Sequence, residues 1–180
     1  MSRWSRWFKG ALAASSWVVA AACAGPQRPD GGRGLLPVGS PVPNVVGVDQ
    51  QGTEHALSKL AGRVTVVYFY PKDQTPGCTK EACAFRDAWA RYRDAGVMVF
   101  GVSSDKRESH RRFAAKHGLE FPLIADTDRA WANAFGVGST AGLYQRVTFV
   151  LGRDGKVAKV YPRVDPGVHA SQVLQDIGRL

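Results

Sequence analysis

Short apolar runs alternate with amphipathic stretches from Pro43 to the end of the chain, and this alternation predicts an α/β fold. The run at 64–70 is almost continuously apolar and ends at Pro71, so it predicts a central strand buried on both faces. A second run, at 97–102, has the same character. Shorter strands are predicted at 44–48, 54–57, 121–125, 146–151 and 156–161, with turns at 49–52 and 154–155 that would join the first two and the last two as hairpins.

The segment after the first long strand has the residue spacing of a helix. Ala82, Phe85 and Trp89 recur at intervals of three and four residues, which predicts an amphipathic helix over 78–95 that ends at Gly96. Two strand-helix-strand units followed by a hairpin and a last helix fit a three-layer sandwich. Further helices are predicted at 103–118, where Ser103, Ser104 and Asp105 form a start signal, at 129–135 and at 169–180.

Residues 1–22 have the pattern of a secretory signal peptide. Arg3, Arg6 and Lys9 form a basic start without acidic residues, and the apolar run at 11–22 follows and ends in alanines. This run is shorter than the roughly 20 residues that a permanent transmembrane helix needs. We therefore expect the protein to be exported, either as a periplasmic protein or as a lipoprotein anchored to the membrane.

Cys23 decides between these two destinations. It follows three alanines, where bacterial lipoprotein signals place the cysteine that is lipidated, but the leucine usual three residues earlier is Ala20 here. Lipidation of Cys23 and its removal or retention as an inert residue both remain open. Residues 23–36 are rich in Gly and Pro and predict a flexible tether, so the folded domain is expected over 37–180.

The net charge at first suggests a polyanionic partner. The 180 residues include 24 Lys and Arg against 15 Asp and Glu, a formal charge of +9. Loss of the signal peptide would remove three of these positive charges and leave +6. The densest basic cluster, at 106–112, contains Glu108 and lacks interleaved aromatic residues, so we expect no nucleic-acid partner and no membrane contact beyond a lipid on Cys23.

The candidate chemistry lies between the first long strand and its helix. A chain of this size folds without crosslinks, so its three cysteines, Cys23, Cys78 and Cys83, are not expected to form a structural framework. Cys78 opens the predicted helix, where unpaired backbone N–H groups and the helix dipole favour a thiolate. We expect a free, exposed, reactive thiol there, and a Thr75 hydroxyl pointed at the sulfur or at the group that it attacks.

The spacing of Cys78 and Cys83 limits how the two can pair. Five residues along an intact helix separate two Cα atoms by roughly 8 to 9 Å. A disulfide requires less than about 7 Å. Pairing therefore requires the first turns of the helix to unwind.

The stretch 70–87 resembles a peroxiredoxin. It carries the P-x-x-x-T-x-x-C signature of that family as Pro71, Thr75 and Cys78, and the further cysteine at Cys83 is similar to the bacterioferritin comigratory protein branch, also called the PrxQ type. The resemblance extends over 37–180. It implies a thioredoxin-like α/β/α sandwich with a mixed central sheet and an amino-terminal β-hairpin, and the activity of a thiol peroxidase that needs no cofactor or metal.

The resemblance also implies roles for particular residues. Cys78 would attack hydrogen peroxide or an organic hydroperoxide and become a sulfenic acid, and Cys83 would resolve it into a Cys78–Cys83 disulfide. Arg146 would stabilise the thiolate and the peroxide oxygens. Thioredoxin or a thioredoxin-like reductant would restore the thiols. Pro71 would shield the site, and Glu81 would orient the arginine.

Alternatives remain at this point. An exported thiol-disulfide oxidoreductase would act on other proteins, although the chain has no C-x-x-C motif, and a third possibility is a tethered binding or metal-carrier module. Cys83 could be inert, and Arg146 could be an ordinary surface charge. We expect a monomer, and the preferred peroxide is left open. The four histidines show no metal-ligand spacing and are expected to be surface or capping residues; they are His55, His110, His117 and His169.

Overall fold

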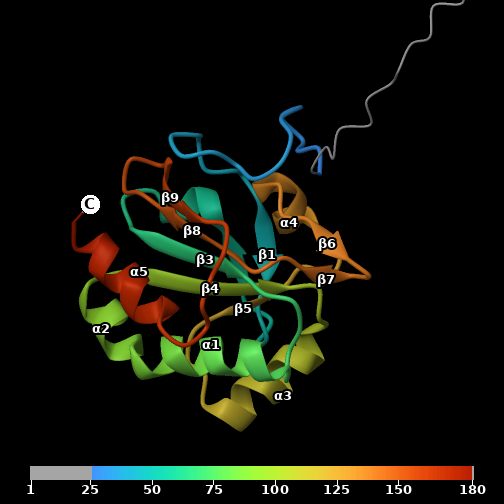
Figure 1. Ribbon diagram of the computed structural model, residues 1–180, viewed down its shortest axis with the longest axis vertical. Coiled ribbons are helices and arrows are strands. Elements are labelled where there is room, and N and C mark those ends of the chain that lie inside the picture. The colour runs from blue at the N-terminus through green and yellow to red at the C-terminus, as the bar shows by residue number, and fades with distance from the viewer. Residues whose placement is uncertain (1–25, 180) are drawn as a thin grey trace, which may run out of the picture.

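A five-stranded sheet lies at the centre of the computed structural model, which describes residues 26–179 (Figure 1). Its strands are β3 Thr65–Phe69, β4 Met98–Ser103, β5 Leu123–Ala125, β8 Val147–Leu151 and β9 Val157–Tyr161. They follow the order β5-β4-β3-β8-β9. Because β3 pairs in parallel with β4 and antiparallel with β8, the sheet is mixed, as predicted.

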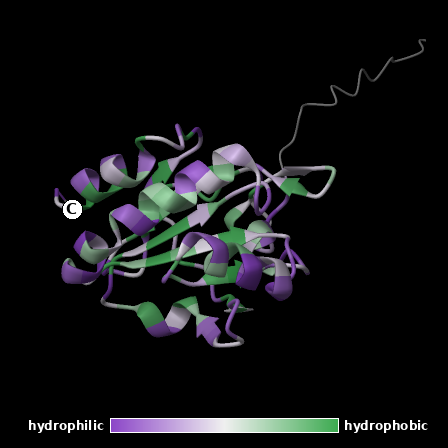
Figure 2. Ribbon diagram, turned by 90° about the horizontal axis from the view of Figure 1, so that it is seen from below, coloured by the Kyte–Doolittle hydropathy of each residue, from purple (hydrophilic) through white to green (hydrophobic). Residues whose placement is uncertain are grey.

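The middle strand, β3, is covered on both faces. All five of its residues are buried. Val66 and Tyr68 belong to one hydrophobic cluster, and Val67 and Phe69 belong to the other, because successive side chains of a strand point to opposite faces. The prediction of a buried central strand is confirmed, and Figure 2 shows the hydrophobic positions concentrated along the strands in the interior.

Four helices contribute to the cluster on one face of the sheet: α1 Pro76–Asp87, α2 Trp89–Asp94, α3 Arg107–His117 and α5 His169–Ile177. The single helix expected over 78–95 is divided in two at Ala88. After this break, Tyr92 is buried, and its hydroxyl donates a hydrogen bond to the carbonyl of Ala170 in α5. The terminal helix is confirmed but ends earlier than expected.

The helix α3 begins later than its start signal predicts. Ser103 is the last residue of β4, and its hydroxyl donates to the carboxylate of Asp105. That carboxylate also accepts the backbone N–H of Asp73. The side chains that resembled a helix cap therefore bind a neighbouring loop, and the end of α3 at Gly118, with φ of 62°, is the one that the sequence predicts.

The opposite face of the sheet carries smaller elements. The hairpin of β1 Val46–Val48 and β2 Glu54–Ala56 is present as predicted, followed by the 3₁₀ helix η1 Leu57–Leu60. The helix α4 Ala130–Phe135 begins where Asp126 accepts the N–H groups of Trp131 and Ala132. The short hairpin of β6 Ser139–Thr140 and β7 Leu143–Tyr144 was not predicted. The three layers together give the thioredoxin-like sandwich that the sequence suggested.

Residues 26–36 differ from the expected flexible tether. Arg28 is nearly buried and donates to the carbonyls of Arg33, Gly34 and Leu35. Leu36 donates its N–H to the carbonyl of Phe135 and packs into the core. The guanidinium group satisfies backbone carbonyls of this turn, so the segment packs on the domain although it contains few apolar residues. The expected signal peptide and Cys23 lie outside the described residues.

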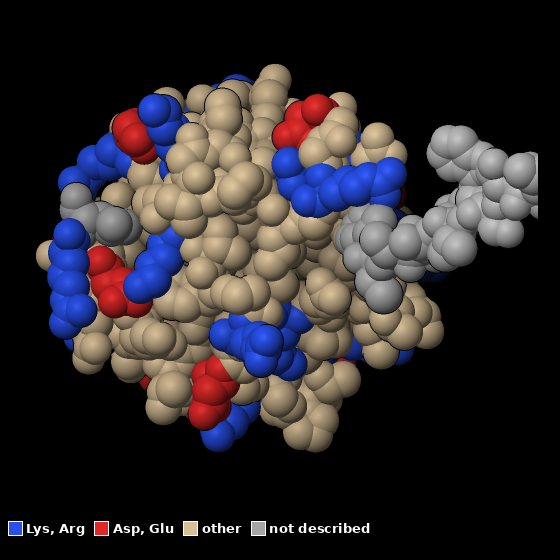
Figure 3. Space-filling view, turned by 45° about the horizontal axis from the view of Figure 1, so that its top comes forward, with Lys and Arg blue, Asp and Glu red and all other residues tan. Residues whose placement is uncertain are grey.

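The charges of the surface are divided into small groups. On the face shown in Figure 3, basic side chains lie in separate clusters, several of them beside acidic ones. Salt bridges join neighbours such as Arg111 and Glu108 at 3.0 Å. Over the described part of the chain, no helix has both the length and the apolar character required to cross a bilayer.

Candidate active site

Cys78 lies in the first turn of α1, immediately after the loop that leaves β3. Thr75 precedes the helix in extended conformation, and Pro76 occupies the first helical position, where its missing N–H costs nothing. The sulfur therefore lies beside the unpaired N–H groups of the helix start. The thiol is not exposed as the sequence suggested, because Cys78 is 1% exposed and packs into the core cluster.

Arg146 contacts both Cys78 and Glu81. Its Nη2 donates to Sγ of Cys78 at 3.2 Å, and its Nη1 donates to Oε2 of Glu81. Gly77 leaves room for this contact, because a Cβ there would lie 3.3 Å from Nη2. The arginine side chain is only 19% exposed, so it is not an ordinary surface charge. Burial opposes its charge, but Glu81 and Cys78 together raise the pKa of Arg146 above its usual value.

Glu81 is a fully buried acid. Its Oε1 has no hydrogen-bond partner. Burial raises the pKa of Glu81 to about 7, although Arg146 opposes the shift. The carboxyl group is therefore partly protonated near neutral pH.

Tyr68 is a neighbour of Glu81 and Arg146 that the sequence analysis did not single out. Its hydroxyl is buried and has no partner in the structure. Burial, together with the nearby carboxylates of Glu81 and Asp73, raises the pKa of Tyr68 well above its usual value. The alternation of β3 could have indicated that Tyr68 faces the α1 side of the sheet, but not that its hydroxyl lies near the carboxyl of Glu81.

Thr75 does not bond to the sulfur in this structure. Its hydroxyl donates to the carbonyl of Lys72 at 3.0 Å, because that acceptor lies within the same loop. Pro71 is half-buried at the start of the loop. The structure therefore gathers Cys78, Arg146 and Glu81 into direct contact and keeps Thr75 in the adjoining loop.

Two of the four histidines are buried, so their prediction as surface or capping residues is wrong. His110 is buried beneath the loop and bonds to Asp73, which the sequence also failed to single out. His169 is buried between the rings of Phe85 and Tyr161, and burial lowers its pKa to about 4. Periodicity could have shown that His110 faces inward with Phe113, three residues away on the same helix face.

Cys83 lies farther along α1 and is half-buried. Both Cys78 and Cys83 are free thiols, and α1 is continuous across them. This is the intact-helix arrangement in which the spacing forbids a disulfide.

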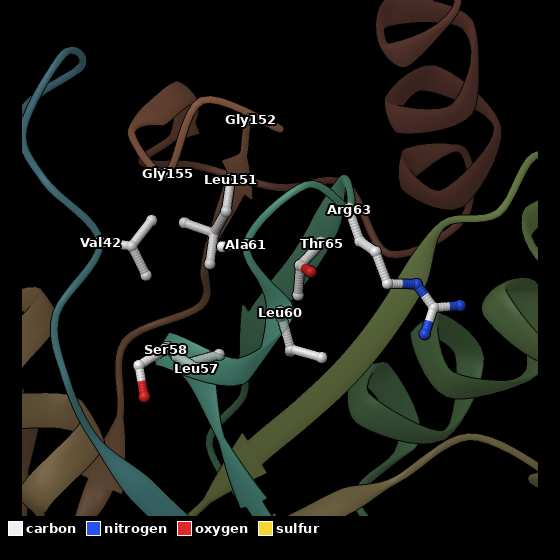
Figure 4. Close-up of a pocket in the computed structure, with 10 residues that line it drawn as sticks. All are labelled: Val42, Leu57, Ser58, Leu60, Ala61, Arg63, Thr65, Leu151, Gly152 and Gly155. Atoms are coloured by element: carbon white, nitrogen blue, oxygen red, sulfur yellow. The ribbon is translucent and has the colours of Figure 1, made fainter.

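A pocket of about 140 Å³ lies at the other end of β3, far from the cysteines (Figure 4). It is lined mainly by apolar side chains, and by Thr65, whose buried hydroxyl has no partner. The pocket and Cys78 therefore occupy opposite ends of one strand. Within residues 26–179, no group of three or more His, Cys, Asp or Glu side chains is placed to hold a metal ion.

Comparison with known proteins gives consistent matches. The AhpC/TSA family matches residues 38–160. The chloroplastic peroxiredoxin Q of Oryza sativa subsp. japonica is 39% identical over 173 residues, which cover 93% of this chain and 80% of that protein. A Coxiella burnetii protein that carries the name peroxiredoxin bcp is 37% identical over 152 residues, 81% of this chain and 99% of its own length.

A solved structure adds a match in three dimensions. The bacterioferritin comigratory protein of Xanthomonas campestris, whose structures concern its alkyl peroxide reduction activity, aligns with a TM-score of 0.72 and 34% identity. The alignment covers 79% of this chain and 98% of that protein. The similarity therefore extends over nearly the whole described domain.

The contact between Arg146 and Cys78 leads to a first prediction. We expect Glu81→Gln/Arg146→Gln to react with peroxide at Cys78 about 10- to 100-fold more slowly than Glu81→Gln, because a hydrogen bond to a charged group contributes roughly 1.5 to 3 kcal/mol. The Glu81→Gln background avoids leaving a buried carboxylate without its partner. Stopped-flow measurement of thiol loss checks this, with exposed Arg153→Gln as the control. Equal rates in the two variants would show that Arg146 does not activate the sulfur.

The burial of Glu81 leads to a second prediction, for stability against pH. The raised pKa, about 7, means that the folded state holds the proton more tightly than the unfolded chain does. Relative to Glu81→Gln, we expect the wild-type protein to lose on the order of 3 kcal/mol of unfolding free energy as pH rises from about 4 to about 8, and no more above that. Urea unfolding across this range measures the difference. A wild-type unfolding free energy that stays constant or rises relative to Glu81→Gln across this range would contradict the proposed protonation.

Proposed function

Because the chain belongs to the AhpC/TSA family and is similar in sequence to peroxiredoxin Q proteins, we propose that it is a thiol peroxidase that uses Cys78 to reduce hydrogen peroxide and organic hydroperoxides. The observation that carries the proposal is the hydrogen bond from Arg146 to Sγ of Cys78 at the start of α1. The Xanthomonas relative supports the organic part of the substrate range.

In the first step, the Cys78 thiolate attacks one oxygen of the peroxide. The S–O bond forms as the O–O bond breaks, the sulfur is oxidised to a sulfenic acid that keeps the peroxide proton, and the other oxygen leaves as alkoxide or hydroxide and takes a proton from water. Arg146 stabilises negative charge on the sulfur before the step. The same cation, with the N–H groups of the helix start, can stabilise the charge that develops on the oxygens.

In the second step, Cys83 resolves the sulfenic acid. Its sulfur attacks Sγ of Cys78, a disulfide forms, and the hydroxyl leaves as water. Since α1 is intact between the two cysteines in the reduced form, this step requires the helix start to unwind.

An external dithiol then reduces the disulfide and restores both thiols. We propose thioredoxin or a thioredoxin-like protein for this role. The alternative of a thiol-disulfide oxidoreductase finds no support in the family match, and the expected monomer stays a prediction.

We further propose that the protein is exported, with Cys23 as the candidate lipid attachment site. The support is the basic start and apolar run of residues 1–22, and the alanines before Cys23. The reductant would then be one available outside the cytoplasm.

Replacement of Cys78 and replacement of Cys83 should have different effects on catalysis. We expect Cys78→Ser to abolish turnover, because the attacking atom is gone. Cys83→Ser should keep a first oxidation rate within a few-fold of wild type but stop turnover with thioredoxin and promote overoxidation of Cys78. Peroxide consumption and intact-protein mass spectrometry check both variants. Undiminished turnover in Cys78→Ser would refute the peroxidase, and slow first oxidation in Cys83→Ser would refute the division of roles.

The amino terminus of the natively expressed protein tests export. We expect mass spectrometry to find a chain that lacks residues 1–22 and begins at Cys23 with a diacylglyceryl group. A mature chain that begins after Cys23 would contradict lipidation but support export. A chain that keeps residues 1–22 would contradict both.

A further inference from the structure

The helix α3 is bonded to the chain on both sides of the segment that carries Cys78 and Cys83. Before that segment, His110 bonds to Asp73, and Nζ of Lys116 donates to Gln74 at 3.3 Å. After it, Arg86 donates to the carbonyl of His117 at 2.9 Å. Among the hydrogen bonds of the described residues, none joins 75–85 to α3.

The first attachment is a buried ion pair. The side chains of His110 and Asp73 are 0% and 1% exposed. Nδ1 of His110 lies 2.9 and 3.1 Å from the two carboxylate oxygens, and Nε2 lies 3.1 Å from the carbonyl oxygen of Ile124. Carboxylates and carbonyls only accept hydrogen bonds, so a ring that satisfies both neighbours carries a proton on each nitrogen.

Asp73 is held from two further directions. Its carboxylate accepts the hydroxyl of Tyr70 at 2.8 Å, and its backbone N–H donates to Asp105 at 2.9 Å. Burial alone would raise the pKa of Asp73, but the hydrogen bonds and charge of His110 hold it below its usual value. The loop is thereby fixed to the end of β3, to α3 and to the β4–α3 connection.

The second attachment lies at the opposite end of α3. His117 is the last residue of that helix, where free carbonyls attract cations. Arg86 reaches it from α1, three residues after Cys83. The side chain of Arg86 also bonds to Asp87.

The start of α1 is easier to open than the attachment of the preceding loop to α3. Backbone groups freed when the start of α1 unwinds can bond to water. Release of Asp73 from His110 would instead separate two buried polar groups that water does not reach, which is far more costly. Unwinding that begins at Cys78 should therefore stop when it reaches the attachments to α3.

We propose that α3 brackets the segment that rearranges, with the His110–Asp73 pair fixing its amino end and the Arg86–His117 bond fixing its carboxyl end. Opening is then confined to 75–85, and the loop before it stays in place to receive Cys78 again after reduction. His110 and Asp73 are positioning residues that act through the loop. The proposal rests on the Cys78–Cys83 disulfide of the proposed function.

Hydrogen exchange on the full wild-type chain, reduced and after one equivalent of peroxide, tests the bracket directly. We expect protection to fall only within 75–85 and to stay unchanged at 70–74 and 86–94. Loss of protection at either flank in the disulfide form would overturn the bracket. If peroxide forms no disulfide, the proposed function fails instead, and the bracket is tested on the disulfide made with the thiol oxidant diamide.

Variants test the role of each attachment. His110→Gln cannot carry the charge, so we expect opening to spread into 70–74 and the first oxidation of Cys78 to slow about tenfold or more through misplacement of the loop. Disulfide formation should not slow. Arg86→Gln should instead let opening spread into 86–94. The control, Arg111→Gln, removes an exposed charge next to His110 and should match wild type within about twofold.

Two further measurements separate positioning from a general loss of stability. Nitrogen NMR should show His110 as an imidazolium in wild type, and Asp73→Asn should abolish that signature. Asp73→Asn and His110→Gln should slow oxidation no more together than either does alone, because they remove one shared interaction. A neutral ring in wild type, or additive losses, would overturn the role of the pair. Since exchange on wild type needs no substitution, failure of a variant to fold leaves the main test intact.

Discussion

The site depends on one cation, because the guanidinium of Arg146 is shared between a buried carboxyl and a sulfur. The sheet places it there. Phe69, at the end of β3, pairs with Val147, at the start of β8, so Arg146 stands directly beside the point where the chain leaves β3 for α1. A contact between residues 68 positions apart in sequence thus follows from the register of two neighbouring strands. A shift of that register by one residue would turn the side chains of β8 to the wrong faces.

The same cation explains why the carboxyl of Glu81 is tolerated in the core. A buried carboxylate is costly without a partner, and a buried arginine is costly without an anion. Each group lowers the cost of the other, and the sulfur is the third member of the cluster. When Glu81 holds a proton, more of the charge on Arg146 is available to the sulfur, so the two acidic groups compete for one cation.

The sequence predicted the parts of the molecule that repeat a simple pattern. The continuous apolar run of β3 required a strand covered on both sides, and the loop with Cys78 followed from the helix start and the family signature. The missed features depend on partners distant in sequence. His110 and Asp73 are 37 residues apart, and only the packing of α3 against the loop shows that each satisfies the other. The order of residues 26–36 was missed for a different reason, because the partners of Arg28 are nearby backbone carbonyls that no residue pattern reveals.

The burial of Cys78 separates the two kinds of partner that the sulfur would meet. While α1 is folded, the sulfur is enclosed, so a thiol or disulfide of another protein cannot contact it. In the proposed disulfide form, the helix start would be open, and the same sulfur would belong to a loosened segment that another protein can approach. The fold would then separate the two proposed reactions, because the oxidant would meet the sulfur while α1 is folded and the reductant would meet it after the helix start has opened. The two reactions would not compete for the same state of the protein.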